Sequence, residues 1–175
     1  MFGALGWMVA TVVVFIVAGT AAWAGWRAAP FVPTRQRDVE RMLRLADVRP
    51  GEVVYDLGAG DGRFVVAAAR RGARAVGFEI SLLPYLVACI RLLIARVGGA
   101  GKMRFQDFFH QDLSTADVVV CFLTPPAMKK LGEKFTKELR PGTRIVSYAF
   151  AIHDWTPELK DKPNPSTMAV YLYRR

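Results

Sequence analysis

The sequence predicts an α/β protein with a doubly wound, mostly parallel sheet, preceded by one N-terminal transmembrane helix. Short apolar runs alternate along the chain with stretches of helical periodicity, which is typical of a parallel sheet covered on both faces. A glycine-rich turn follows the first of these runs, and residues 1–26 contain no charged side chain. The final apolar run has no helix before it, so we expect it to form an antiparallel edge strand. Together these features describe a Rossmann-like fold.

The apolar segment at the N-terminus is long enough to cross a membrane. Residues 2–26 span about 30 Å of hydrocarbon as a helix. Trp7, Trp23 and Trp26 lie near its ends, where indole rings favour the membrane–water boundary. A cleaved signal peptide, with Ala22-Trp23-Ala24 as the cleavage site, and a buried soluble helix are the alternatives. No basic region precedes the run, which favours a permanent anchor through residues 1–26.

The charges flanking this segment predict its orientation. No Lys or Arg precedes it, whereas arginines follow it closely: Arg27, Arg35, Arg37, Arg41, Arg44 and Arg49. Positive charge prefers the cytoplasmic side of a membrane. We therefore expect the N-terminus outside and the folded domain in the cytoplasm, or on the matrix side of an organelle. The formal net charge is +9, but no platform of aromatic and basic residues is visible, so no nucleic-acid partner is expected.

The first half of the domain contains a linker, a helix and a strand–turn–helix unit. Two prolines stiffen the linker Pro30–Thr34. A helix from Arg35 follows, because apolar residues recur at helical spacing: Val39, Met42, Leu43 and Ala46. The next strand, 53–55, enters the glycine-rich turn, and the helix through 64–69 leaves it and ends at Gly72. Residues 75–78 form the second strand.

The second half continues the alternation. Pro84 suits the first turn of a helix that runs to Arg96 and ends at Gly98-Gly99. Pro125-Pro126 opens another helix, whose lysines we interpret as a solvated face. Residues 155–166 have the composition of a loop. The remaining strands are short runs of apolar and β-branched residues: 103–105, 117–123, 144–150 and 168–173.

The glycine-rich turn indicates the ligand. Its sequence from Asp56 to Gly62 is Asp-Leu-Gly-Ala-Gly-Asp-Gly, between a strand and a helix. A dinucleotide fingerprint would place its third glycine at position 63, which is Arg63. The carboxylate of Asp56 would also repel a pyrophosphate. It suits a cationic ligand such as S-adenosylmethionine, with its amino group and sulfonium.

Two more carboxylates follow successive strands and fit the same ligand. Glu79 ends the second predicted strand, where a carboxylate can accept hydrogen bonds from ribose hydroxyls. Asp107 follows the third strand, where it can accept from the adenine amino group, with Phe108 against the ring. Each residue alone is weak support, since acids are common at protein surfaces. Three acids at three successive strand ends indicate one site.

With these residues the sequence resembles the class I, seven-strand S-adenosylmethionine-dependent methyltransferases. It resembles in particular the membrane-anchored protein-lysine methyltransferases that modify the adenine nucleotide translocase and the ATP synthase c subunit. The narrower resemblance rests on Pro30–Thr34, residues 56–63, Phe122-Leu123-Thr124-Pro125-Pro126 and Trp155-Thr156-Pro157. It covers roughly residues 30–160, and the apolar segment before them agrees with it. We therefore divide the chain into an anchor at residues 1–26, a linker and helix at 27–50, and a methyltransferase domain at 51–175.

The resemblance also implies roles for individual residues. Thr34 would close over the cofactor, Glu79 would hold the ribose and Asp107 the adenine. Four residues would bind the methionine moiety and line the loop: Asp56, Gly58, Gly60 and Asp61. We expect Thr124, Pro125 and Trp155 to position the acceptor, and we expect no metal. The segment Thr124-Pro125-Pro126-Ala127 lacks the Asp or Asn and the aromatic residue of amide and adenine N-methyltransferases, which disfavours those acceptors.

These observations predict a membrane-anchored methyltransferase that modifies a lysine of a membrane-associated protein. A lipid, a quinone or another small molecule is the alternative acceptor, and a non-catalytic S-adenosylmethionine-binding protein is the second alternative. A general base is not evident, because His110 and His153 are the only histidines and suit surface or supporting positions. Cys89 and Cys121 lie in apolar surroundings and are interpreted as buried thiols in a reducing compartment.

Overall fold

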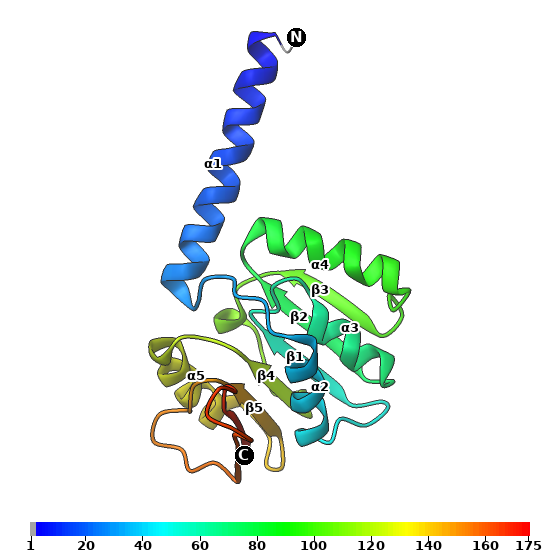
Figure 1. The fold of residues 1–175 in the computed structure, drawn as a ribbon, viewed down its shortest axis with the longest axis vertical. Coiled ribbons are helices and arrows are strands. Elements are labelled where there is room, and N and C mark those ends of the chain that lie inside the picture. The colour runs from blue at the N-terminus through cyan, green and yellow to red at the C-terminus, as the bar shows by residue number, and fades with distance from the viewer. Residues whose placement is uncertain (1–2) are drawn as a thin grey trace.

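The computed structural model describes residues 3–175, and it contains one seven-stranded sheet with helices on both faces (Figure 1). The strand order is β3-β2-β1-β4-β5-β7-β6. The strands are β1 Val53–Leu57, β2 Arg74–Glu79, β3 Gly101–Phe105, β4 Val118–Cys121, β5 Arg144–Tyr148, β6 Leu159–Asp161 and β7 Val170–Arg174. The helices are α1 Ala4–Arg27, α2 Gln36–Leu45, α3 Arg63–Arg70, α4 Leu82–Ala95, α5 Pro125–Glu138 and a 3-10 turn, Phe108–His110.

The five strands from β3 to β5 are parallel, which confirms the predicted Rossmann-like sheet. The chain proceeds outward from β1 to β2 and β3, and then returns to β4 on the other side of β1. The strand order therefore reverses between β1 and β4. In open parallel sheets, ligands bind at the carboxyl ends of the strands flanking this reversal. The fold places the glycine-rich turn after β1 at that point.

The antiparallel part of the sheet differs in detail from the prediction. The last strand, β7, runs antiparallel to β5 as expected. It is not the outermost strand, because β6 pairs with its other side. We predicted a loop through residues 155–166, but Leu159–Asp161 forms this short edge strand. Its side chains are mostly exposed, so it lacks the alternating pattern by which a half-buried strand is recognised.

Two apolar clusters hold the helices on the sheet. One joins α2, α3 and α4 to one face, with Val39, Met42, Leu43 and Ala46 of the predicted helix all buried in it. The other joins α5 to the opposite face around Met128, Leu131 and Phe135. A buried hydrogen bond adds to the first cluster, since the Tyr148 hydroxyl donates to Asp38 Oδ2 at 3.0 Å. Both sheet faces are thus covered, as the apolar strands required.

The helix α1 extends away from the domain (Figure 1), and most of its side chains are exposed. Met1 and Phe2, where the expected span begins, lie outside the described residues. Several hydrogen bonds fix the end of α1 to the domain, including an ion pair of Arg27 with Asp107. The Leu82 amide donates to Thr20 Oγ1 at 3.2 Å, and the Thr124 amide donates to the Ala28 carbonyl at 3.1 Å. The two contacts connect α1 to α4 and to the segment after β4.

Two local predictions need correction. We predicted a helix that runs to Arg96 and is ended by Gly98-Gly99. The helix α4 ends one residue earlier, at Ala95, and Arg96 itself takes the left-handed conformation that ends it, with φ of 55°. A non-glycine residue at that position is uncommon, so the glycines were the stronger sequence signal. Cys121 is buried as expected, whereas Cys89 is only half-buried, and both thiols are free.

Candidate active site

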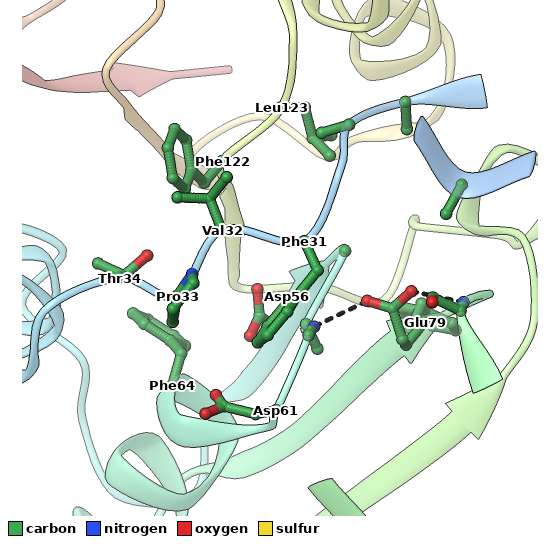
Figure 2. Close-up of a pocket in the computed structure, with 18 of the residues that line it drawn as sticks. Phe31, Val32, Pro33, Thr34, Asp56, Asp61, Phe64, Glu79, Phe122 and Leu123 are labelled. Atoms are coloured by element: carbon green, nitrogen blue, oxygen red, sulfur yellow. Dashed lines mark hydrogen bonds between the residues drawn. The ribbon is translucent and has the colours of Figure 1, made fainter. Parts of the chain in front are cut away.

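A pocket of about 180 Å³ lies at the carboxyl ends of β1 and β4 (Figure 2). Its walls come from the end of α1 with the linker that follows it, from α2, and from the glycine-rich turn with the start of α3. The ends of β1, β2 and β4, the segment after β4 and the 3-10 turn at Phe108 complete the lining. We call residues 30–34 the strap and residues 58–62 the glycine loop. The pocket brings together most of the residues that the sequence singled out for the cofactor.

Asp56 ends β1 beneath the strap (Figure 2), and its side chain is buried. Burial, reinforced by the negative charges of Glu79 and Asp61, raises the pKa of Asp56 to about 8. No hydrogen bond from the described residues counters these effects. A buried carboxylate without a partner is costly, and a cation beside it restores the charged form. The chemistry of this wall therefore fits the α-ammonium group of S-adenosylmethionine.

Glu79 connects the end of β2 to the glycine loop. Its Oε2 accepts a hydrogen bond from the Gly60 amide at 2.8 Å, and its Oε1 accepts from the Ile80 and Ser81 amides (Figure 2). Each carboxylate oxygen can accept two hydrogen bonds. One position on Oε2 is thus available to a ribose hydroxyl, while the other bonds fix the carboxylate and the loop.

Asp61 lines the pocket, but its carboxylate is bound by two arginines. Arg63 donates to both of its oxygens, at 2.8 and 2.6 Å, and Arg91 of α4 donates to Oδ2 at 2.7 Å. Burial opposes ionisation, yet the hydrogen bonds and charges of the two arginines keep the pKa of Asp61 below its ordinary value. Arg63 also donates to the Thr34 carbonyl. Asp61 therefore ties the glycine loop to both α4 and the strap.

The strap lies directly against the glycine loop. A Cβ atom at Gly60 would come within 2.6 Å of the Phe31 ring, so only glycine allows this approach. Gly60 also has a φ of 53°, in the region that favours glycine. Thr34 lines the pocket, and its carbonyl accepts a hydrogen bond from Arg63, the residue that follows the loop. Figure 2 shows Val32 of the strap beside Phe122.

The predicted adenine residues are placed differently from each other. Phe108 is buried and lines the pocket. Asp107 is not among the lining residues. Its Oδ2 accepts from Arg27 Nε at 2.8 Å and its Oδ1 accepts from the Phe109 amide at 2.9 Å. Asp107 thus forms an ion pair with Arg27, the last residue of α1. This ion pair joins residues 80 positions apart, and the sequence did not indicate it.

The three predicted acceptor-positioning residues are not brought together. Thr124 caps α5 and donates its hydroxyl to the Ala28 carbonyl, and the exposed Pro125 begins the helix. Both follow Leu123, which lines the pocket. Trp155 lies elsewhere, with its ring centroid 6.1 Å from that of Tyr173 and its indole near Gly132 of α5. It is not among the residues lining the pocket.

Sequence reasoning missed the contribution of α1 to the pocket. Four small residues from its end and the adjoining linker form one wall: Ala21, Ala24, Ala28 and Ala29. We treated this segment as an anchor separate from the site. The one signal available was the run of alanine and glycine between residues 18 and 29, since small side chains allow close packing against other segments. Ala24 and Ala28 are indeed buried.

The comparison with protein families agrees with this pocket. Residues 56–159, more than half of the chain, match the ANTKMT methyltransferase domain. The chain belongs to this family. It is an S-adenosylmethionine-dependent methyltransferase, as the buried Asp56, Glu79 and the glycine loop indicated. The match begins at Asp56, the first residue of the predicted cofactor motif.

Named relatives cover most of the chain. A protein-lysine N-methyltransferase of Saccharolobus islandicus (strain REY15A) is 40% identical over 148 residues, which cover 82% of this chain and 92% of that protein. The human lysine N-methyltransferase of the ATP synthase c subunit is 36% identical over 131 residues, covering 74% of this chain and 55% of that protein. The mouse adenine nucleotide translocase lysine N-methyltransferase is 38% identical, and the matched region covers 73% and 56% of the two chains. The chain thus spans little more than half the length of these mammalian relatives.

A solved structure supports both the fold and the cofactor. An RNA methyltransferase of Salinibacter ruber in complex with S-adenosyl-L-homocysteine has a TM-score of 0.78 and is 40% identical. The matched region covers 82% of this chain and 93% of that protein. S-adenosylhomocysteine is what remains of S-adenosylmethionine after methyl transfer, so a relative of nearly the same extent binds the demethylated form of the cofactor that this pocket fits.

Proposed function

We propose that this methyltransferase modifies a lysine side chain of a membrane protein while α1 holds it in the membrane. One observation carries the proposal: the end of α1 is a wall of the cofactor pocket, through Ala21, Ala24 and Ala28. An enzyme whose site is built on the end of its membrane segment reaches acceptors close to the membrane surface. The relatives named for lysine methylation of the ATP synthase c subunit and the adenine nucleotide translocase support this acceptor class.

The properties of α1 support its role as a membrane span. It has 24 residues, a length of about 36 Å, and a mean hydropathy of 2.1 over its most apolar window. A cleaved signal peptide would remove the helix near Ala22–Ala24. That cleavage would also remove Ala21 from the pocket wall and Thr20 from its hydrogen bond with Leu82. These contacts favour a retained anchor, with Arg27 and the arginines that follow it on the cytoplasmic or matrix side.

The roles of the pocket residues follow from their positions. We assign the α-ammonium group to Asp56, a ribose hydroxyl to Glu79, and one face of the adenine ring to Phe108. Asp107 retains an acceptor position for the adenine amino group, because each of its oxygens accepts only one of the bonds described above. Gly58 and Gly60 let the methionine moiety lie against bare main chain, and Asp61 fixes the loop in place.

The acceptor side of the pocket suits an amine that must lose its proton. A lysine with an ordinary pKa of 10.4 needs about 4–5 kcal/mol to become neutral at pH 7. Apolar walls disfavour the charged ammonium, and Phe31, Phe122 and Leu123 supply such walls here. When bound, S-adenosylmethionine supplies a sulfonium methyl group: the lysine Nζ lone pair forms the N–C bond as the C–S bond breaks, and the sulfur keeps that electron pair. The new secondary ammonium releases its extra proton to water.

Transfer of labelled methyl to membranes from cells lacking the gene tests this proposal. We expect methyl-lysine in the hydrolysate of one or a few membrane protein bands with the intact protein. At a cofactor concentration near the native Kd, we expect strongly reduced label with Asp56→Asn and full label with Glu133→Gln, which removes an exposed carboxylate on α5. Label in the lipid extract or in RNA would contradict the proposal. Cofactor binding without label in any fraction would favour a non-catalytic binding protein.

A further inference from the structure

The helix α4 is apolar on two opposite faces. Pro84, Ala88 and Leu92 are buried against the domain. The opposite face exposes six large apolar side chains at helical spacing: Leu83, Leu86, Val87, Ile90, Leu93 and Ile94. Leu93 and Ile94 are 77% and 76% exposed. Contiguous exposed apolar surface marks an interaction site in most folded proteins, and a helix that is hydrophobic all round is normally covered on every side.

The location of this face identifies what covers it. The start of α4 contacts α1, since the Leu82 amide donates to Thr20 Oγ1. Thr20 lies one helical turn before Trp23, and the 20 residues from Ala4 to Trp23 cover about 30 Å, the thickness of the hydrocarbon core. The start of α4 is therefore at the depth of the membrane boundary. Figure 1 shows α4 running crosswise to α1 on the side of the domain from which α1 projects.

The charges around α4 suit an anionic lipid surface. Residues 80–106 contain four basic residues and no acidic one. Arg96 at the end of α4 and Lys102 and Arg104 of the adjoining edge strand are exposed. A groove of about 720 Å³ between α2, α3 and α4 is lined by four arginines and one carboxylate, Glu40, which is paired with Arg71. On the α4 side it is lined by aliphatic residues: Val87, Ile90, Ile94 and Ala95.

We propose that α4 lies in the surface of the bilayer as a second membrane contact, with its outer face among the acyl chains. The exposed basic residues around it, Arg96, Lys102 and Arg104, then contact anionic headgroups. This inference rests on the proposed anchoring by α1. With both α1 and α4 in contact with the membrane, the tilt of the domain relative to the membrane is fixed. The ion pair of Arg91 with Asp61 connects α4 directly to the glycine loop. The cofactor pocket is thereby held at a constant height above the membrane.

Depth-dependent quenching in the full-length, reconstituted protein tests the proposal. The background is Cys89→Ala, because the remaining native thiol, Cys121, is buried. Three variants each add one cysteine for labelling with an environment-sensitive fluorophore: Leu93→Cys, Val13→Cys and Lys130→Cys. Vesicles contain brominated phosphatidylcholine, with or without phosphatidylglycerol. We expect about a twofold loss of fluorescence at positions 93 and 13 and almost none at exposed position 130 of α5. Quenching at 93 should increase with phosphatidylglycerol.

The three positions separate the two claims. Quenching at 13 without quenching at 93 would overturn the role of α4 and leave the anchor intact, and a protein partner or a second copy would then cover this face. Absence of quenching at both 13 and 93 would instead contradict the anchoring itself. A label at position 90, introduced as Ile90→Cys, should be quenched in the native background. The same label should lose its quenching when Leu93→Glu and Ile94→Glu are added. Persistence of that quenching would also count against the proposal.

Discussion

The substitution Asp56→Asn removes a charge that the buried pocket wall disfavours. The pKa of Asp56 is raised from an ordinary 3.8 to about 8, first by burial and then by Glu79 and Asp61. Each pKa unit corresponds to about 1.4 kcal/mol, so full ionisation of Asp56 opposes folding by an amount on the order of 6 kcal/mol. Asparagine has nearly the same shape and cannot ionise. The variant should therefore be more stable than the native protein and should bind the cofactor poorly.

The pH dependence follows from the direction of the shift. Between about pH 4 and pH 8 the folded protein keeps a proton on Asp56 that the unfolded chain has lost. The free energy of unfolding therefore falls as pH rises through this range, by about 1.4 kcal/mol per pH unit from this residue. Asp56→Asn removes this contribution. The stability advantage of the variant should grow toward pH 8 and level off above it.

Urea denaturation of the cofactor-free protein from pH 5 to pH 9, in one detergent, measures the effect. Glu133→Gln, which changes an exposed carboxylate, serves as the matched control and should follow the native curve. Binding of S-adenosylhomocysteine, measured by calorimetry, should weaken about 10- to 100-fold in Asp56→Asn. This is the effect expected when a hydrogen bond to a charged group is lost. A variant that is less stable at pH 8, or one that binds as tightly as the native protein, would refute this reasoning.

Three further substitutions test other parts of the site. Gly60→Ala should abolish cofactor binding and lower the free energy of unfolding by about 1–3 kcal/mol. The added Cβ would meet the Phe31 ring at 2.6 Å, and the φ of residue 60 is positive. Calorimetry measures the binding, and urea denaturation measures the stability. Arg63→Ala should raise the cofactor Kd with little loss of secondary structure, because the glycine loop and strap lose their connection; an unchanged Kd would contradict this. Tyr148→Phe should cost about 1–3 kcal/mol by leaving the buried Asp38 without this donor, and a neutral result in urea denaturation would argue against that bond.

Much of the fold was predictable because its signals are local. The glycine loop after β1 needs residues that tolerate a tight turn, and Gly58, Gly60 and Gly62 all have positive φ. The parallel strands are too apolar for a sheet that is exposed on one face, and β4 is entirely buried. The edge strand β6 was missed because pairing with β7, rather than its own sequence, makes it a strand.

The site was predictable only in part, because several of its contacts join distant segments. Asp56 and Glu79 lie at the carboxyl ends of β1 and β2, positions that the strand pattern of the sequence indicates. The ion pairs of Asp61 with Arg91 and of Asp107 with Arg27 join residues 30 and 80 positions apart. No periodicity or motif encodes such pairs. The alanines of α1 could not be assigned to the pocket from the sequence either, since only the folded chain brings the end of α1 to the glycine loop.

The position of the modified lysines in the membrane proteome tests the central claim most directly. Mass spectrometry would map methyl-lysine in cells that have the gene, lack it, or express Asp56→Asn. The pocket wall formed by Ala21, Ala24 and Ala28 predicts that the gene-dependent sites lie in membrane proteins, within a few residues of a predicted membrane boundary. Gene-dependent sites in soluble proteins, or methylation that persists with Asp56→Asn, would contradict the claim.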